Sequence, residues 1–198
     1  MFMENKKRIS IFIDQANLWS SCKKIWKVFD FSKFRSYFEK LFEWEVKHIF
    51  FYQAYPKDWD REYNMDNLHK FFVKLEKWFW FKVRKKPLKT ITLRDKEWHI
   101  IYDQKTWKPA TIEKWNFDVE LSIDAQWYMD EYDIWVFFSW DSDFLPLINL
   151  LKNNWKSVYV FSSEDSISKE LKSSCNKYFD IIECTELHWN DIRNRKTK

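Results

Sequence analysis

Acidic side chains follow two apolar stretches of the chain, in positions typical of a site for a divalent cation. Asp14 ends the isoleucine-rich run of residues 8–14, and Asn17 follows one helical turn later, where its amide could orient the acid. Asp141 and Asp143 come after a second apolar run. Magnesium and manganese prefer oxygen ligands, and carboxylates gathered at one place repel one another unless a cation neutralises them. These acids therefore predict a metal site if the fold brings them together.

A third acid, Asp118, opens a segment whose apolar spacing predicts a helix at 117–131. The helix dipole favours an acid at this position for structural reasons alone, so Asp118 could be a metal ligand or simply a capping residue. Asp141 and Asp143 could likewise cap the helix that follows them. Two weaker candidates on other faces of the 117–131 helix are Glu120 and Asp124.

The elements that would position these acids alternate between strand and helix. Short apolar runs typical of buried parallel strands occur at 8–14, 46–55, 79–86, 133–139, 156–162 and 179–184. Apolar residues three and four positions apart predict helices at 31–43, 60–78, 117–131, 142–154 and 166–175. Between 87 and 116 the alternation breaks into KTITLRD, a turn, HIIYD at 99–103 and a basic loop at 104–116, which predicts a β-hairpin insertion.

Strands that alternate with helices predict a three-layer α/β/α sandwich with a mainly parallel, Rossmann-like sheet, because crossovers between parallel strands are right-handed. Ligands bind beyond the carboxyl ends of such strands, where Asp14 and Asp141 would lie. A chain of 198 residues fits one domain, which we expect at 1–188, followed by a basic flexible tail at 189–198.

Composition narrows the class of protein. No apolar run approaches the roughly 20 residues that span a bilayer, and the first residues do not look like a signal peptide, so we expect a cytoplasmic protein with no membrane partner. Cys22, Cys175 and Cys184 lack metal-binding spacing and are odd in number, so we expect reduced thiols, mostly buried. The net charge of +4 permits a polyanionic partner such as RNA without demonstrating one.

The chain contains no glycine and 14 tryptophans, although an average chain of this length has about 14 glycines. Trp98, Trp107 and Trp155 stand at turns and after a helix, where glycine is favoured because a positive φ costs it little. We hypothesise that the gene uses UGA for glycine and that the printed tryptophans come from translating UGA as tryptophan. The alternative is a natural tryptophan-rich protein, in which Trp140 would push an indole between Ser139 and Asp141.

Three segments of the chain resemble the NYN domains of the PIN-like nuclease superfamily. They are IFIDQANL, KWNFDVELSIDA and VFFSWDSDFLPLINLLKNNWKSVYVFS, and the likeness covers about residues 8–184. In that family glycine usually stands at the positions of Trp140 and Trp155, which fits the glycine hypothesis. Gln15 departs from the family, which commonly has glycine or asparagine after the first aspartate.

The resemblance implies an endoribonuclease that cuts single-stranded RNA with one or two Mg²⁺ or Mn²⁺ ions. The implied catalytic and metal-binding residues are Asp14, Asp118, Asp141 and Asp143, supported by Asn17 and Ser139. A metal-activated water would leave a 5′ phosphate and a 3′ hydroxyl, since the four histidines are scattered. Basic residues must hold the RNA near this acidic site, and our candidates are Lys114, Lys85, Lys86 and Arg94.

Other functions compete with this one. An inactive PIN-like RNA-binding or adaptor protein would keep the same acids without cleaving RNA. A haloacid-type phosphatase would need its D-x-D pair after the first strand, where this chain has only Asp14 and Asn17. A dinucleotide-binding enzyme would need a glycine-rich turn there, and DQANLWSS has none even if its tryptophan were glycine. The sequence leaves open whether the chain forms a homodimer.

Overall fold

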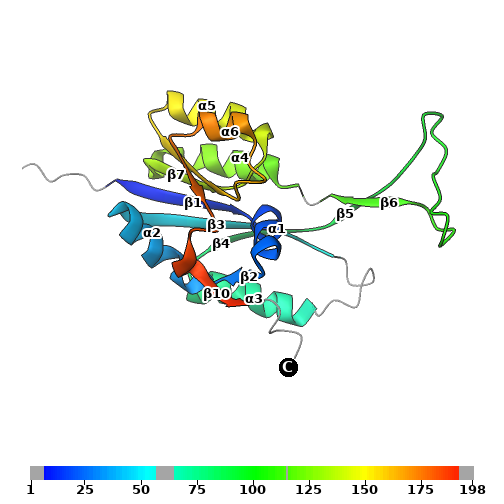
Figure 1. Cartoon of the computed structure of the whole chain (residues 1–198), viewed down its shortest axis with the longest axis horizontal. Helices are drawn as coiled ribbons and strands as arrows, with labels where there is room; N and C mark the ends of the chain where they lie inside the picture. Colours follow the sequence, from blue (N-terminus) through cyan, green and yellow to red (C-terminus); the bar gives the residue numbers. More distant parts are fainter. Residues whose placement is uncertain (1–6, 57–64, 115, 192–198) are drawn as a thin grey trace, which may run out of the picture.

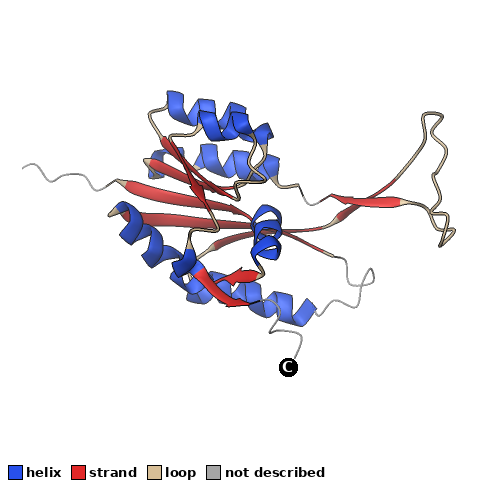
Figure 2. Ribbon diagram, in the orientation of Figure 1, coloured by secondary structure: helices blue, strands red, loops and turns tan. Residues whose placement is uncertain are grey.

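A six-stranded parallel sheet runs through the middle of the structure, with helices on both faces (Figure 1, Figure 2). The computed structural model describes residues 7–56, 65–114 and 116–191. In sheet order the strands are β4 (Lys82–Pro87), β3 (Glu45–Tyr55), β1 (Arg8–Asp14), β7 (Ile134–Phe138), β8 (Ser157–Ser162) and β9 (Lys177–Asp180). Every neighbouring pair is parallel, so the predicted α/β/α fold is confirmed.

The order of the strands places a switch point beside β1. After β1 the chain adds β3 and β4 on one side of it, and then returns to add β7, β8 and β9 on the other side. Parallel sheets bind ligands at such points, beyond the carboxyl ends of the strands. Asp14 ends β1 and Asp141 follows β7, so both acids lie where the topology favours a site.

Two apolar clusters fill the faces of the sheet, because successive residues of a strand point to opposite faces. Ile11 and Ile13 of β1 pack on one face and Phe12 on the other, and all three are fully buried. One face is covered by α1 (Gln15–Ile25), α2 (Phe34–Phe42) and α3 (Met65–Trp78). The other is covered by α4 (Asp118–Trp127), α5 (Leu145–Asn153) and α6 (Lys169–Ser174).

The predicted helices are present within the described residues, with shorter bounds. Residues 60–64 of the predicted helix 60–78 lie outside the described part, and α3 begins at Met65. The predicted helices 31–43, 117–131 and 142–154 each include a 3₁₀ turn, namely Phe31–Lys33, Met129–Glu131 and Ser142–Phe144. The predicted strand 179–184 is displaced toward the N-terminus, because residues 181–184 turn back after β9.

The structure contains one helix and two strands that the sequence analysis did not predict. Helix α1 follows β1 directly, and a small antiparallel sheet joins β2 (Lys27–Phe29) to β10 (His188–Asp191). The expected tail at 189–198 therefore starts inside a strand, because the backbone of 188–191 pairs with β2, and its residues 192–198 lie outside the described part.

The three cysteines are free thiols, and Cys22 and Cys184 are buried as expected. No described helix is long and apolar enough to cross a membrane.

The segment between β4 and α4 forms an arm that stands away from the sheet (Figure 1). β5 (Lys89–Thr92) pairs antiparallel with β6 (Thr111–Lys114), which confirms the hairpin insertion. The expectation that 104–116 is a loop is wrong, because β6 lies within it and HIIYD contributes only isolated bridges. The intervening residues close local turns instead, since Asp95 accepts the His99 N–H at 2.8 Å and Asp103 accepts the Thr106 N–H at 2.8 Å.

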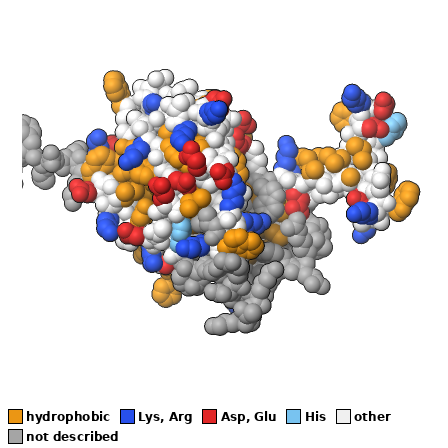
Figure 3. Space-filling model, viewed as in Figure 1, with side chains coloured by type: hydrophobic (Ala, Val, Ile, Leu, Met, Phe, Trp, Pro, Cys, Tyr) orange, Lys and Arg blue, Asp and Glu red, His pale blue; other side chains and the backbone are white. Residues whose placement is uncertain are grey.

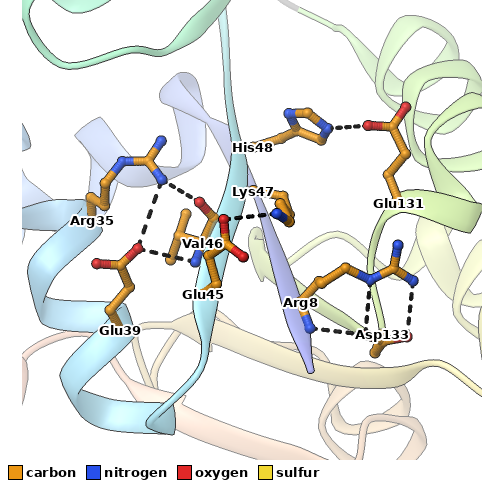
Figure 4. A network of polar contacts seen from close by, with 9 residues as sticks. All are labelled: Arg8, Arg35, Glu39, Glu45, Val46, Lys47, His48, Glu131 and Asp133. Atoms are coloured by element: carbon orange, nitrogen blue, oxygen red, sulfur yellow. Dashed lines mark hydrogen bonds and ion pairs between the residues drawn. The ribbon is translucent and has the colours of Figure 1, made fainter. Parts of the chain in front are cut away.

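Charged side chains at the amino-terminal edge of the sheet are paired (Figure 4). The guanidinium of Arg8 donates to both carboxylate oxygens of Asp133 at 3.2 Å, and the Arg8 backbone N–H donates to the same group at 2.8 Å. His48 Nε2 lies 2.7 Å from the Glu131 carboxylate. These contacts join the starts of β1 and β3 to the chain just before β7, so Asp133 has a cationic partner and Glu131 an imidazole partner.

Tryptophan occupies most of the left-handed backbone positions in the described residues. Apart from Glu43, the described residues with positive φ are all tryptophans, namely Trp26, Trp80, Trp98, Trp107 and Trp155, with φ between 54° and 67°. All five indoles are more than half exposed. A side chain with a Cβ costs on the order of 1 kcal/mol in this region, a cost that glycine avoids. The three positions singled out from the sequence therefore have the backbone that favours glycine.

We predict that Trp155→Gly stabilises the protein. Trp155 follows α5 with φ 61° and its side chain is 94% exposed, so the substitution relieves backbone strain and removes almost no packing. The free energy of unfolding should rise by about 1 kcal/mol, which raises Tm by about 2–4 °C in a chain of this size. Trp19→Gly is the matched control: it lies within α1, where glycine should destabilise by up to about 1 kcal/mol. A lower Tm for Trp155→Gly would contradict the prediction.

Candidate metal centre

Three acids from two separate segments meet at the carboxyl-terminal edge of the sheet. Asp118, Asp141 and Asp143 each offer a carboxylate oxygen within 4.8 Å of the other two. Two ligands of one magnesium ion lie at most about 4.2 Å apart, so small side-chain rotations would let one ion bind all three. Among the described residues none of these acids forms an ion pair, in contrast to the paired acids at the opposite edge. The donor set therefore fits a hard divalent cation.

Asp14 lies near this group without belonging to it. Its Oδ1 accepts the Ala16 N–H at 3.0 Å and its Oδ2 accepts from Asn17 Nδ2 at 2.7 Å, so the side chain caps α1. The pKa of Asp14 is raised to about 7, mainly by burial and also by the charges of Asp118 and Asp141, against the hydrogen bonds that lower it. Asp14 is thus close enough to be affected by both acids, and its role as a ligand stays a prediction.

Buried hydrogen bonds link Asp14 to the loop after β7. Asn17 Nδ2 donates to Ser139 Oγ at 2.7 Å as well as to Asp14, and Ser139 Oγ accepts the Asp141 N–H at 3.2 Å. Asp141 Oδ1 in turn accepts the Asp143 N–H at 2.9 Å. Because Asn17 and Ser139 are buried, they fix the acidic loop relative to β1. The supporting role of both residues in a metal site stays a prediction.

Asp118 both starts a helix and faces the other acids. Its backbone N–H donates to Asn116 Oδ1 at 2.8 Å, and its carboxylate accepts from Asn116 Nδ2. Burial is the largest cause that raises the pKa of Asp118, and Asp141 and Asp143 add to it, while Asn116 and Lys86 lower it. Asn116 was not among the predicted site residues, although an asparagine just before a helix is a recognisable capping signal.

A partly buried clamp holds the helix that carries Asp118. Arg84 of β4 donates to Asp124 through Nε at 2.8 Å and Nη2 at 2.9 Å, and the Tyr52 hydroxyl donates to Asp124 at 2.9 Å. Tyr52 also pairs with Asp14 in the register of β1 and β3. Asp124 is thus held by this clamp, which ties α4 to the sheet and so positions Asp118. Nothing local in the sequence marks Arg84 or Tyr52 as partners of an acid so far along the chain.

The four basic candidates lie in different surroundings. Lys86 pairs with an acid of α4, and Lys85 lies over an aromatic ring of α3, on the opposite face of β4. Arg94 donates to a backbone carbonyl in the outer part of the arm. Lys114 is exposed at the end of β6, four residues before Asp118. Among the four candidates, Lys114 is therefore the one that is close to Asp118 in the chain and forms no ion pair with another described residue.

The chain is similar to known proteins in sequence and in fold. A sequence profile of the NYN domain matches residues 8–183, a span that includes all four predicted acids. Low amplitude and bright protein LabA of Synechococcus elongatus is 29% identical over 187 residues, which cover 94% of this chain and 86% of LabA. A crystal structure of a protein of unknown function from Vibrio parahaemolyticus has a TM-score of 0.63 at 20% identity, covering 91% of this chain and 96% of that one. At this identity the structural likeness shows a shared α/β fold.

With a chelator present, we predict that protonation of Asp14 makes the protein more stable in mild acid. The Asp14 pKa is about 7 in the folded state against 3.8 for an ordinary aspartate, so the folded state holds this proton more tightly. The resulting stability is complete below about pH 4 and is lost as the pH rises toward about 7.

The measurement is the free energy of unfolding in urea at several pH values for the wild type, Asp14→Asn and the control Asp130→Asn. The free energy of unfolding of the wild type and of Asp130→Asn should decline as the pH rises. Asp14→Asn should lack the part of this decline that comes from Asp14. Parallel curves for the wild type and Asp14→Asn would contradict the prediction.

Proposed function

Because the chain belongs to the NYN domain family, which is associated with nuclease activity, we propose that it is a divalent-metal-dependent endoribonuclease that hydrolyses single-stranded RNA. The observation that carries the proposal is the group formed by Asp118, Asp141 and Asp143, whose oxygens lie within 4.8 Å of one another without a cationic partner among the described residues. The carboxylates of such a group repel one another near neutral pH, and a bound cation relieves that repulsion. Mg²⁺ and Mn²⁺ match its all-oxygen donors.

The roles proposed for the acids follow from how each is held. Asp118, Asp141 and Asp143 would hold the cation, and Asp14 would complete the set from the end of β1, oriented by its bonds to Ala16 and Asn17. When bound, the cation would supply the charge that makes a water acidic and stabilises the attacked phosphate. Asn17 and Ser139 would hold the loop after β7 in place against the repulsion between the carboxylates.

RNA is the proposed partner, and it must be held by positive charge around an acidic centre. We assign this role first to Lys114, and then to Lys85, Lys86 and Arg94. An inactive RNA-binding or adaptor protein is the second candidate function, since it would have the same basic residues and acids without cleavage.

We further propose that glycine occupies tryptophan positions of the native protein because its gene uses UGA for glycine. Five tryptophans with positive φ support this, as does Trp135, which is fully buried in β7 with no hydrogen-bond partner for its indole Nε1 among the described residues. Trp140 is partly buried between Ser139 and Asp141, and the hydrogen bond that joins these two neighbours is kept. Glycine at this position would leave the acidic loop less crowded.

The glycine proposal predicts UGA codons at positions 140 and 155 of the gene. It also predicts an intact mass for the protein from its native host well below the 24.9 kDa of the printed sequence, because glycine is much lighter than tryptophan. Gene sequencing and mass spectrometry provide the two measurements. Ordinary UGG codons with an intact mass of 24.9 kDa would end the proposal.

The nuclease proposal predicts cleavage of single-stranded RNA that requires Mg²⁺ or Mn²⁺ and stops with chelator. Asp141→Asn should lower the rate by at least about 100-fold, since even residues that only support metal ligands affect activity by 10–100-fold. It should also reduce the rise in Tm that the metal causes. Asp130→Asn, an exposed acid at the other edge of the sheet, should change neither.

These assays should be run on the printed chain and on a chain with glycine at the tryptophan positions, so that a defect caused by the indoles is recognised. Cleavage that resists chelator would contradict the metal requirement. RNA binding without cleavage by either chain would favour the inactive RNA-binding protein.

A further inference from the structure

The basic side chains of β4 closest to the acids are already paired. Lys86 Nζ lies 2.6 Å from Glu120 Oε1, and Arg84 makes two hydrogen bonds to Asp124. These charges hold α4 on the sheet and are largely neutralised by their acidic partners. A polyanion that approaches the metal centre therefore needs positive charge from another part of the chain.

The root of the arm supplies unpaired charge of this kind. Lys89 starts β5 and Lys114 ends β6, and the two residues are directly opposite in the antiparallel register. Both side chains are exposed, and neither forms an ion pair within the described residues. Like charges directly opposite on paired strands destabilise the pair, so this arrangement is unfavourable unless an anion lies between or beside them.

The two lysines share their face of the arm with aliphatic side chains. Because alternate residues of a strand point the same way, Lys89 and Ile91 lie on the face that also carries Ile112 and Lys114. The other face carries Thr90, Thr92, Thr111 and Glu113. Ile112 is 45% exposed, and in Figure 3 apolar side chains run along the arm, with basic ones at its root. This face thus offers cations for phosphates and an apolar surface for bases.

The arm is also joined directly to the proposed metal centre. β5 begins two residues after β4 ends, and β6 ends four residues before Asp118. Lys86, next to the end of β4, lies 2.6 Å from Glu120, two residues after Asp118 in α4, so the end of β4 lies near the start of the helix that carries this acid. A strand of RNA held at the arm root would therefore continue toward the group formed by Asp118, Asp141 and Asp143.

We propose that the face of the arm root formed by Lys89, Ile91, Ile112 and Lys114 binds single-stranded RNA beside the metal centre, with a backbone phosphate between the two lysines. The choice of single-stranded RNA as the ligand rests on the nuclease function proposed above. It makes the arm a positioning surface for RNA that takes no part in the chemistry.

The test measures binding of a fluorescent single-stranded RNA in chelator, where no cleavage occurs, over a range of salt concentrations. Lys89→Gln with Lys114→Gln should weaken binding and reduce the slope of log K against log salt by about 1.4, which is about 0.7 for each lost phosphate contact. In cleavage assays with metal, KM should rise while kcat stays close to the wild-type value. The control Lys40→Gln with Lys47→Gln removes two charges elsewhere and should leave the slope unchanged.

A second variant separates RNA binding from folding of the arm. Lys89→Glu places opposite charges across the strands, so Tm should stay the same or rise while RNA affinity falls. An unchanged salt slope and affinity in the glutamine double variant would overturn the proposal, even if the protein cleaves RNA. Loss of self-association in light scattering with unchanged RNA binding would also overturn it, in favour of a second copy of the chain at the arm. A reduced slope in a protein that never cleaves RNA would support the arm proposal while the nuclease proposal fails.

Discussion

Repulsion among carboxylates at one edge of the sheet is the force that the surrounding contacts must balance. Asp118, Asp141 and Asp143 offer carboxylate oxygens within 4.8 Å of one another, and burial with nearby negative charge raises the pKa of both Asp14 and Asp118. A fold that only maximised its stability would separate such groups or pair them with lysine and arginine. At the amino-terminal edge the protein does pair its charges, as Arg8 with Asp133 shows.

Two partly buried polar networks hold the acids together against this repulsion. One runs from Asp14 through Asn17 and Ser139 to the backbone of Asp141, and so joins the strands on either side of the switch point. The other anchors α4 through Asp124 to Arg84 and Tyr52, and so sets the position of Asp118. Charge-assisted and bidentate hydrogen bonds are stronger than neutral ones, which suits them to this purpose. The candidate metal centre is therefore positioned by the sheet and α4 together.

The tryptophans affect the stability of the fold through the conformation of the backbone. In the described residues their left-handed positions are at turns and helix ends, where the indoles extend into solvent and leave the core undisturbed. The cost is thus conformational and local, so the sheet and its helices form around it. Trp140 differs because its backbone φ is not positive and it adjoins a site residue on each side.

Local patterns in the amino-acid sequence are enough to predict the buried strands and the edge of the sheet at which their acids lie. The apolar runs that end in Asp14 and precede Asp141 mark buried strands, and acids at strand ends must lie at the carboxyl edge of a parallel sheet. Which charges are paired depends on contacts that form only in the folded protein. Aspartate is a clamp partner at position 124 and a candidate metal ligand at position 118, because helical rotation turns Asp124 toward Arg84 and Asp118 toward Asp141. The partner of β5 was likewise beyond local pattern, since cross-strand register is set by contacts between residues far apart in the chain.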